Sequence, residues 1–315
     1  MKNTRKDIPI FFAVDDGYIP FLAVSLQSLK DTMSLENNYL VKVLYNNISE
    51  SNIKKIKKYE CENVSIEFVD VTNHIQKISE KLYTRDYYSK STYFRLFIPD
   101  LFPEFDKALY LDSDIAILED IAGLYDIDIG NNLVGAAPDG AVQVIDEFKV
   151  YVERVVGVND FNNYFNAGIL IMNLKEMRAF DFQEKFVYLL STIKFKVAQD
   201  QDYLNRICKG RVKIISDSWD KMPFAELEDK KQKLNLIHYN LSFKPWHYDN
   251  ILYEEFFWPV AKKTEYYDDI IAMKNNYTDE EKSRDKEAGD GLVVLAMKEA
   301  SCVGSDNPNC FIIKE

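Results

Sequence analysis

The sequence has 315 residues, of which 47% are hydrophobic and 14% aromatic. This length and composition exclude a disordered chain and allow one large α/β domain with an extension, or two domains. The formal net charge of −12 argues against nucleic acid as a partner, because a protein that binds nucleic acid must bring positive charge to the phosphates.

The cysteines and the apolar runs favour a protein that is neither exported nor inserted in a membrane. The four cysteines form no CxxC pair, which favours reduced thiols, although Cys302 and Cys310 are near enough in sequence to bridge. The apolar run at residues 8–14 stops at Asp15 without a small-residue cleavage site. No run approaches the roughly 20 apolar residues of a membrane span. We therefore expect a soluble, cytoplasmic protein without a transmembrane segment.

The first seventy residues alternate between strand and helix patterns. Residues 8–14, 39–45 and 64–69 are apolar or alternating and predict strands. A helix is expected from Pro20, and a short amphipathic helix with a serine cap is expected at residues 49–58. Such βαβ units predict a mostly parallel sheet flanked by helices.

Polar residues follow the first predicted strand at the edge where a parallel sheet binds ligands. Asp15 can accept a hydrogen bond from a nucleotide base, and Tyr18 can offer its ring for stacking. Taken alone, Asp15 and Asp16 are better explained by an ordinary polar turn.

A second acidic turn follows the apolar, β-prone run at residues 108–111. Asp112, Ser113 and Asp114 interrupt the apolar sequence, which resumes at residues 115–118. Two carboxylates at the mouth of a buried strand are costly unless a cation relieves them, and a divalent metal with oxygen ligands does so. A surface turn rich in aspartate is the alternative. The apolar flanks favour the metal site.

Arg95 is a cation within the aromatic stretch 91–98. We expect a helix here that is capped by Ser89 or Ser91 and ends before Pro99. A buried arginine there either pairs with Asp112 or Asp114, or it contacts a phosphate or carboxylate of a ligand. The sequence leaves both readings open.

The second half of the chain carries further polar groups among apolar elements. Gly168 interrupts an expected strand, which indicates a close approach by a ligand or backbone, and Asn166 suits a sugar hydroxyl. Capping of a short helix explains one aspartate of the run at residues 199–205, but not the whole run. The other expected elements are strands at 132–138, 164–174, 212–215 and 234–237 and helices at 142–156 and 177–193.

His238 closes the strand at 234–237, six residues before Lys244. This loop therefore offers a borderline metal ligand and an ammonium group suited to phosphate.

Six of these segments, in this order, resemble glycosyltransferase family 8, which includes bacterial lipopolysaccharide galactosyl- and glucosyltransferases and glycogenin. They are FFAVDDGY (11–18), STYFRL (91–96), ALYLDSDI (108–115), YFNAGILIMNL (164–174), QDQDYLN (199–205) and HYNLSFKPW (238–246). The resemblance implies an α/β, GT-A type domain over residues 1–250 with a mixed, mostly parallel sheet. It also implies transfer of a hexose from UDP-glucose or UDP-galactose with retention of configuration, and Mn²⁺ as cofactor, with Mg²⁺ as the alternative ion.

The resemblance also assigns roles to residues. Asp112, Asp114 and His238 correspond to the metal ligands. The expected contacts to the donor come from Ala13, Asp15 and Tyr18 at uridine, from Arg95, Ser113 and Lys244 at other donor atoms, and from Asp139, Asn166, Asp200 and Gln201 at the transferred sugar. The chain departs from the family at Gly17, where asparagine is common, and at Leu241, where glycine is common, so the backbone of the phosphate loop is in question.

Asp200 and Gln201 are the candidate catalytic residues. A double displacement needs one of them as nucleophile, whereas a front-face transfer needs none, because the leaving phosphate oxygen takes the acceptor's proton. We favour the front-face route, since an amide is barely nucleophilic. The acceptor implied is a saccharide or a lipid- or protein-linked glycan.

Residues 251–315 are expected to form an extension. The aromatic stretches 251–260 and 265–273 predict short helices, packed on the domain or in peripheral contact with a membrane or acceptor. A solvated helix is expected at 278–290, and residues 291–315 yield no prediction.

Competing functions fail at particular residues. Ala116 stands where a phosphatase of the haloacid dehalogenase type requires threonine or valine, and Ile117 stands where an EF-hand requires glycine. A nucleotidyltransferase would have a loop rich in glycine and arginine near the first strand. The remaining alternative is a catalytically idle, UDP-sugar-binding or scaffold protein.

Overall fold

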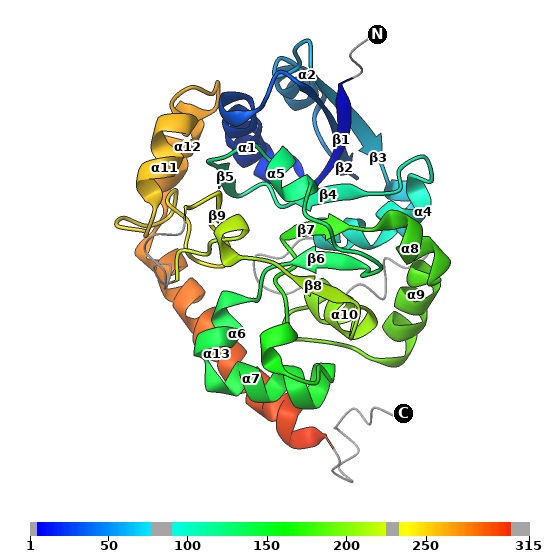
Figure 1. Cartoon of the computed structure of the whole chain (residues 1–315). Helices are drawn as coiled ribbons and strands as arrows, with labels where there is room; N and C mark the ends of the chain where they lie inside the picture. Colours follow the sequence, from blue (N-terminus) through cyan, green and yellow to red (C-terminus); the bar gives the residue numbers. More distant parts are fainter. Residues whose placement is uncertain (1–4, 77–89, 225–232, 304–315) are drawn as a thin grey trace.

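The computed structural model describes residues 5–76, 90–224 and 233–303, and a mixed sheet with helices on both faces forms its centre (Figure 1). The seven strands lie in the order β3-β2-β1-β4-β7-β6-β8. β1 is parallel to β2 and β4, β2 is parallel to β3, and β6 is parallel to β8, whereas β7 is antiparallel to both its neighbours. The strands are β1 Lys6–Ala13, β2 Asn37–Tyr45, β3 Val64–Asp70, β4 Ala108–Leu111, β6 Val134–Ala136, β7 Ile169–Met172 and β8 Val212–Ile214. The expected fold class is confirmed.

Local sequence accounts for the first βαβ units. α1, Ile19–Thr32, begins with Pro20 in its first turn, where proline loses no helical hydrogen bond. α2, Glu50–Lys57, is capped by Ser49, whose side chain accepts from the backbone N–H of Asn52. Both predictions are confirmed.

Alternation along β1 directs its side chains into two separate cores. Ile10 and Phe12 face a core shared with α1, α11 Glu254–Ala261 and α12 Tyr267–Asn276, and Phe11 faces the core on the other side of the sheet. The second core also receives the helices α8 Leu174–Ala179, α9 Phe182–Thr192 and α10 Asp200–Ile207. Burial on both faces explains why these strands read as continuous apolar runs.

A two-stranded sheet lies beside the main one. β5, Ile115–Ile117, pairs antiparallel with β9, Leu236–His238, and Ile115 is opposite His238. Short helices and turns outside the two sheets include η1 Asp16–Tyr18, α3 Thr72–Ile75, α5 Ala122–Tyr125, η4 Phe161–Asn163 and η5 Asp217–Trp219.

The helix expected to end before Pro99 does not end there. A 3₁₀ helix, η2 Lys90–Phe97, runs directly into α4, Ile98–Leu101. Pro99 is accepted because it occupies the first turn of α4, where its missing N–H has no partner to lose. Ser89, one of the two expected caps, lies outside the described residues.

Three expected elements are shorter or divided. The strand expected at 164–174 is reduced to β7. The helix expected at 142–156 is divided into α6 Gly140–Val144, α7 Asp146–Tyr151 and a π-helical turn, η3 Val152–Val156, because Ile145 is extended. The helix expected at 177–193 is divided into α8 and α9 at Asp181, which has φ +55°.

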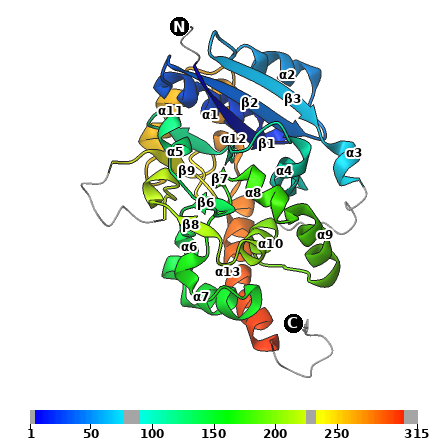
Figure 2. The same ribbon diagram turned by 45° about the vertical axis from the view of Figure 1, so that its right-hand side comes forward.

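The C-terminal region is helical and packs on the rest of the chain. α11 Glu254–Ala261 and α12 Tyr267–Asn276 lie beside α1, and α13 Asp279–Cys302 runs along α7 and η3 (Figure 2). Thr278 and Glu281 form a capping box that starts α13. α13 is longer than the helix expected at 278–290, since it continues through an apolar stretch that packs on the core.

Two features bear on the expectations about membranes and thiols. Among the described residues, no helix is long and apolar enough to cross a membrane. Cys61 and Cys208 are free thiols, as expected. Cys302 is disulfide-bonded, which differs from the expectation of reduced thiols. Cys310 lies outside the described residues.

Candidate active site

Strand pairing brings the acidic turn to His238. β4 ends at Leu111, the turn Asp112–Asp114 follows, and β5 then pairs with the strand that ends in His238. The Ser25 hydroxyl of α1 donates to the carbonyl of Ser113 at 2.6 Å, which fixes the turn from behind. The position of these side chains is therefore set by buried backbone pairing.

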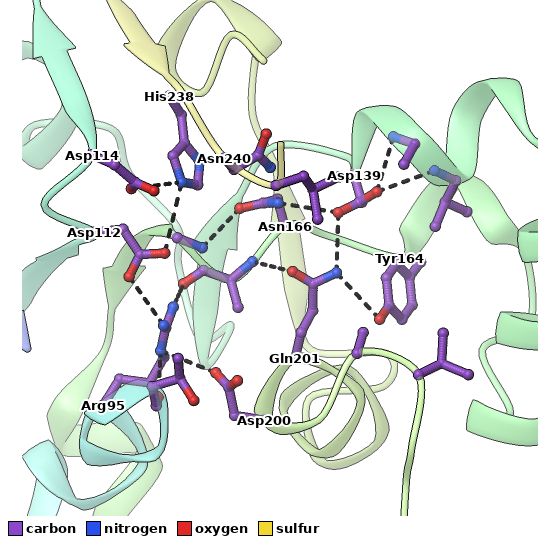
Figure 3. Close-up of a pocket in the computed structure, with 18 of the residues that line it drawn as sticks. Arg95, Asp112, Asp114, Asp139, Tyr164, Asn166, Asp200, Gln201, His238 and Asn240 are labelled. Carbon is purple, nitrogen blue, oxygen red and sulfur yellow. Dashed lines mark hydrogen bonds and ion pairs between the residues drawn. The ribbon is translucent and has the colours of Figure 1, made fainter. Parts of the chain in front are cut away.

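Asp112, Asp114 and His238 form one compact group of potential ligands (Figure 3). Their ligand atoms all lie within 4.8 Å of one another. His238 Nε2 is 3.3 Å from Asp114 Oδ1 and 3.7 Å from Asp112 Oδ2. The structure thus brings together the three residues expected to ligate a metal.

Asp220 fixes the orientation of the His238 ring. Its Oδ1 lies 2.9 Å from His238 Nδ1, on the side of the ring opposite to Asp114. With a proton on Nδ1 donated to Asp220, the lone pair of Nε2 faces the two aspartates, as in histidine ligands oriented by a carboxylate. Burial lowers the pKa of His238, but the carboxylates of Asp220 and Asp114 outweigh it and raise the pKa to about 10, so a metal would have to displace the proton on Nε2 before this lone pair is available. The sequence analysis missed Asp220, because no local pattern links it to a histidine 18 residues later.

Gly168 leaves room for this group. A Cβ built on Gly168 would lie 2.2 Å from His238 Cε1 and 2.8 Å from Asp112 Oδ2. Its carbonyl also accepts the backbone N–H of Asp112 at 2.7 Å. The groups that approach this glycine closely are therefore the side chains of the candidate metal ligands.

Arg95 pairs with carboxylates of the protein. Its Nη2 lies 3.0 Å from Asp112 Oδ1, and its Nε lies 3.1 Å from Asp200 Oδ2. The guanidinium also donates to the carbonyl of Ala167 and lies 4.3 Å from the ring centre of Tyr110. In this structure the ion-pair reading of Arg95 holds, with Asp200 as a second partner that the sequence did not suggest.

A network of amide and carboxylate side chains lies opposite the candidate metal ligands Asp112, Asp114 and His238 (Figure 3). Gln201 Nε2 donates to Asp139 Oδ2 at 3.0 Å, and its Oε1 accepts the backbone N–H of Ala167 at 2.9 Å. Asn166 Nδ2 donates to the same Asp139 oxygen at 3.1 Å. Asp139 in turn caps α6 by accepting from Ala141 and Val142. The amide groups are therefore held in fixed orientations.

The two aspartates of the run at residues 199–205 have different environments. Asp200 pairs with Arg95, and Asp202 accepts from Tyr151 and Tyr164, each at 2.7 Å. Burial raises the pKa of each aspartate to about 6. This explains why capping alone did not account for the run: Asp202 anchors α10, and Asp200 faces the cavity.

Lys244 lies at the end of the site that holds the candidate metal ligands. Its ammonium pairs with Asp114 Oδ2. The Lys244 Nζ atom also lies 5.8 Å from the ring centre of Tyr18. The loop between His238 and Lys244 contains Leu241 at φ +53°, in the left-handed region that favours glycine. The leucine that departs from the family pattern thus keeps a glycine-like backbone conformation at a cost of about 1 kcal/mol.

The end of this loop is attached to the C-terminal helices. The His247 ring stacks on Tyr277 with a centroid distance of 3.8 Å and an angle of 4°. Tyr248 and Tyr277 both donate to Asp285 Oδ2 of α13, at 2.8 Å and 2.7 Å. Residues outside the family resemblance thus hold the loop that carries Lys244.

One cavity of about 170 Å³ contains these groups. Its walls include nearly all of the expected site residues: Ala13, Tyr18, Arg95, Asp112, Ser113, Asp114, Asp139, Asn166, Asp200, Gln201, His238 and Lys244. Asp15 is not among the lining residues, because its carboxylate accepts from the backbone N–H groups of Gly17 and Tyr18. The contacts of Asp15 are therefore those of an ordinary polar turn, which was the alternative to a contact with a nucleotide base. The far wall is apolar and includes Phe148, Val152 and Leu292.

The donor set fits a divalent cation. Two carboxylates and an imidazole oriented through its second nitrogen can all direct lone pairs at one point. A set of two oxygens and one nitrogen suits Mn²⁺ better than Mg²⁺, which prefers oxygen ligands alone. The residues present therefore fit the ion that the resemblance implies.

Solved structures share this fold. The chain is similar to the galactosyltransferase LgtC, determined with donor and acceptor sugar analogues, with TM-score 0.68, 26% identity and coverage of 82% of this chain and 96% of that chain. It is also similar to the bifunctional glycosyltransferase WbbM, with TM-score 0.75 and 25% identity over 87% of this chain, which corresponds to 52% of that longer chain. These likenesses define the class as a GT-A type glycosyltransferase fold.

The sequence places the chain within this class. Residues 9–250 match glycosyl transferase family 8, and the chain belongs to this family. A putative glycosyltransferase of Haemophilus influenzae is 31% identical over 248 residues, which cover 76% of this chain and 72% of the relative. The resemblance found in the six segments is confirmed.

Proposed function

We propose that this protein transfers a hexose, glucose or galactose, from a UDP-sugar to a hydroxyl of a saccharide or glycoconjugate acceptor, with retention of configuration and with Mn²⁺. In this proposal residues 1–250 form the catalytic domain and residues 251–315 an extension. The proposal rests on one observation above all: the candidate metal ligands and the amide–carboxylate network of Asp139, Asn166 and Gln201 share one cavity.

The two ends of the cavity suit the two parts of a nucleotide sugar. A bound Mn²⁺ would supply positive charge against the donor's diphosphate. Asp112, Asp114 and His238 would hold the ion, and the Lys244 ammonium, now paired with Asp114, lies where it can turn to a phosphate oxygen. Tyr18, beside Lys244, offers its ring to the uracil base.

The amide network suits the transferred sugar. Gln201, Asn166 and Asp139 present fixed donors and acceptors, which match hydroxyl groups that both donate and accept. Because Gln201 is held from both ends of its amide, its role is to orient the sugar. The Arg95 ion pair similarly fixes Asp200 in the wall of the cavity.

Retention then proceeds by front-face transfer. The acceptor hydroxyl attacks the anomeric carbon on the side from which UDP departs, and the leaving phosphate oxygen takes its proton. Stabilisation of the charge on that oxygen by Lys244 is the electrostatic contribution that usually matters most in such transfers. No covalent bond to Asp200 or Gln201 is required.

We assign the acceptor to the apolar wall of the cavity. Phe148 and Val152, with Leu292 from α13, offer an apolar surface to the ring face of a sugar or to an apolar group attached to it. The acceptor is a saccharide, a lipid-linked glycan or a protein-linked glycan.

The test is UDP release from a panel of nucleotide sugars, with and without Mn²⁺. We expect slow release of UDP from UDP-glucose or UDP-galactose without any acceptor, and loss of that release with a chelator. Asp114→Asn, which removes one candidate ligand charge at constant size, should abolish it. Equal turnover of GDP- or CMP-sugars would contradict the uridine assignment. Binding of UDP-sugars without any release would instead support an idle, sugar-nucleotide-binding protein.

A further inference from the structure

Asn240 is a buried amide on the cavity wall that the sequence analysis did not select. It lies in the loop between His238 and Lys244, lines the cavity and is only 9% exposed. Its backbone is fixed, since its N–H donates to the carbonyl of His238 at 2.9 Å and its carbonyl accepts from Phe243 at 3.1 Å. The side chain is therefore placed by its loop.

The Asn240 side chain makes no hydrogen bond to any residue in the described ranges. Its Oδ1 is shielded from solvent and has no partner. Asn166 and Gln201, the two other amides of the cavity, are both engaged by Asp139. Buried amides are nearly always hydrogen-bonded, so an unpaired one in the wall of a cavity points to a ligand.

The position of Asn240 indicates the part of the ligand involved. In Figure 3 it lies between His238 and the pair formed by Asp139 and Asn166. It is thus next to the candidate metal ligands, on the side that faces the amide network. A neutral amide offers both a donor and an acceptor, which is the pattern of a sugar hydroxyl and not of a phosphate oxygen, which accepts only.

We propose that Asn240 binds a saccharide hydroxyl at the reacting end of the cavity and helps to select the sugar. This inference rests on the proposed function. The hydroxyl belongs either to the donor's hexose or to the acceptor sugar. Both have the same chemistry, and the experiment below separates them.

A cost in the free protein accompanies this role. An unpaired buried amide destabilises the ligand-free fold, and the ligand removes that cost when it pairs with the amide. A site that hydrogen-bonds a hydroxyl also rejects sugars that lack one there, because the amide would stay unpaired. Asn240 would therefore contribute to both affinity and selectivity.

The test compares wild type with Asn240→Leu, which has nearly the same shape but no polar atom, and with Asn240→Ser, which keeps a donor and an acceptor. Affinities for Mn²⁺, UDP, UDP-glucose and UDP-galactose are measured by calorimetry, and acceptor KM is measured once an acceptor is found. We expect Asn240→Leu to weaken UDP-hexose binding or to raise acceptor KM by about tenfold. Affinity for UDP and Mn²⁺ should not change, and Asn240→Ser should recover part of the loss.

Thermal unfolding provides a second readout. Asn240→Leu should raise the unfolding midpoint of the free protein by on the order of 2 °C, because it removes an unpaired buried group. A purely structural asparagine would lower the midpoint instead. Gln143→Met is the matched control: Gln143 Nε2 is also buried and unpaired, but Gln143 does not line the cavity. It should stabilise without any effect on sugar binding.

Each outcome decides the matter. A loss confined to UDP-hexose places the hydroxyl on the donor, and a loss confined to acceptor KM places it on the acceptor. Equal losses for UDP and UDP-hexose, weaker Mn²⁺ binding, or no change at all would overturn the inference. Failure of the wild type to release UDP would count against the proposed function and not against Asn240, since the binding data do not need turnover.

Discussion

Gly168 and His238 are in such close contact that no other residue fits at position 168. A Cβ there would meet His238 Cε1 at 2.2 Å, which is far inside any tolerated contact. Gly168→Ala must therefore displace the imidazole or the Asp112 carboxylate. We expect activity supported by Mn²⁺ to fall by about 10- to 100-fold, as for the loss of ligand orientation in metal sites. The measurement is UDP release against Mn²⁺ concentration.

Two other glycines serve as controls for this variant. Gly289 and Gly291 lie inside α13, and a Cβ on either meets nothing within 4 Å. Alanine at either position should stabilise the protein by about 0.5–1 kcal/mol through helix propensity, with no change in Mn²⁺ dependence. If Gly168→Ala behaved like these controls, the packing described around His238 would be wrong.

The second prediction separates the three histidines. His238→Ala should reduce activity supported by Mn²⁺ by orders of magnitude while the fold survives. His74 is exposed on α3, and His74→Ala should be nearly silent. His247→Ala should leave the Mn²⁺ concentration for half activity unchanged, since this ring stacks on Tyr277 away from the ligands.

A pH series tests the His238 assignment further. The imidazole must lose its proton to bind a metal, so affinity for Mn²⁺ should weaken as the pH falls. A His238→Ala variant with wild-type Mn²⁺ dependence would remove His238 from the site.

The third prediction concerns the reaction route. Gln201→Ala should lower the rate but leave a product of retained configuration, because Gln201 orients the sugar and does not attack it. Mass spectrometry of the protein during turnover should show no glycosyl adduct on Asp200 or Gln201. A trapped adduct on either residue would establish double displacement instead.

The fourth prediction is a stability difference that depends on pH. Burial raises the pKa of Asp202 to about 6 despite the hydrogen bonds from Tyr151 and Tyr164. The folded state therefore binds this proton more tightly than the unfolded state, and stability falls as the pH rises from about 4 to about 6. Asp202→Asn should remove this slope, which is worth about 2–3 kcal/mol for a shift of about two pKa units.

Urea unfolding between pH 4 and pH 7 provides the measurement. Asp268→Asn is the control, because the Asp268 side chain is exposed on α12. Parallel stability curves for wild type and Asp202→Asn would show that Asp202 titrates near its ordinary value in the fold.

Much of the fold and of the site is local in origin and was predictable. Strands such as β1 and β4 are buried on both faces and read directly as apolar runs, and the turn Asp112–Asp114 stands out because it interrupts such a run. The resemblance to a family then linked this turn to His238, more than 100 residues away. Strand periodicity alone does not supply that link.

The errors have tertiary causes. The residues just before β7 were assigned to a strand, but Phe165 is held by the Asn205 side chain, which accepts its N–H and donates to its carbonyl. Asp220 could not be found because its role exists only after β9 pairs with β5. Asn240 was overlooked because its significance lies in a missing hydrogen bond, which no sequence pattern displays.

The attachment of the Lys244 loop to Tyr277 and α13 has a consequence for how such enzymes diversify. Tyr277 and Asp285 hold the loop from one side, and Leu292 reaches the cavity from the same extension. Changes in this extension can therefore alter the apolar wall while the metal ligands stay untouched. If the proposed function holds, grafting the corresponding helices from a relative should change the range of acceptors, provided that the aromatic contacts to His247 and Tyr248 are transplanted with them.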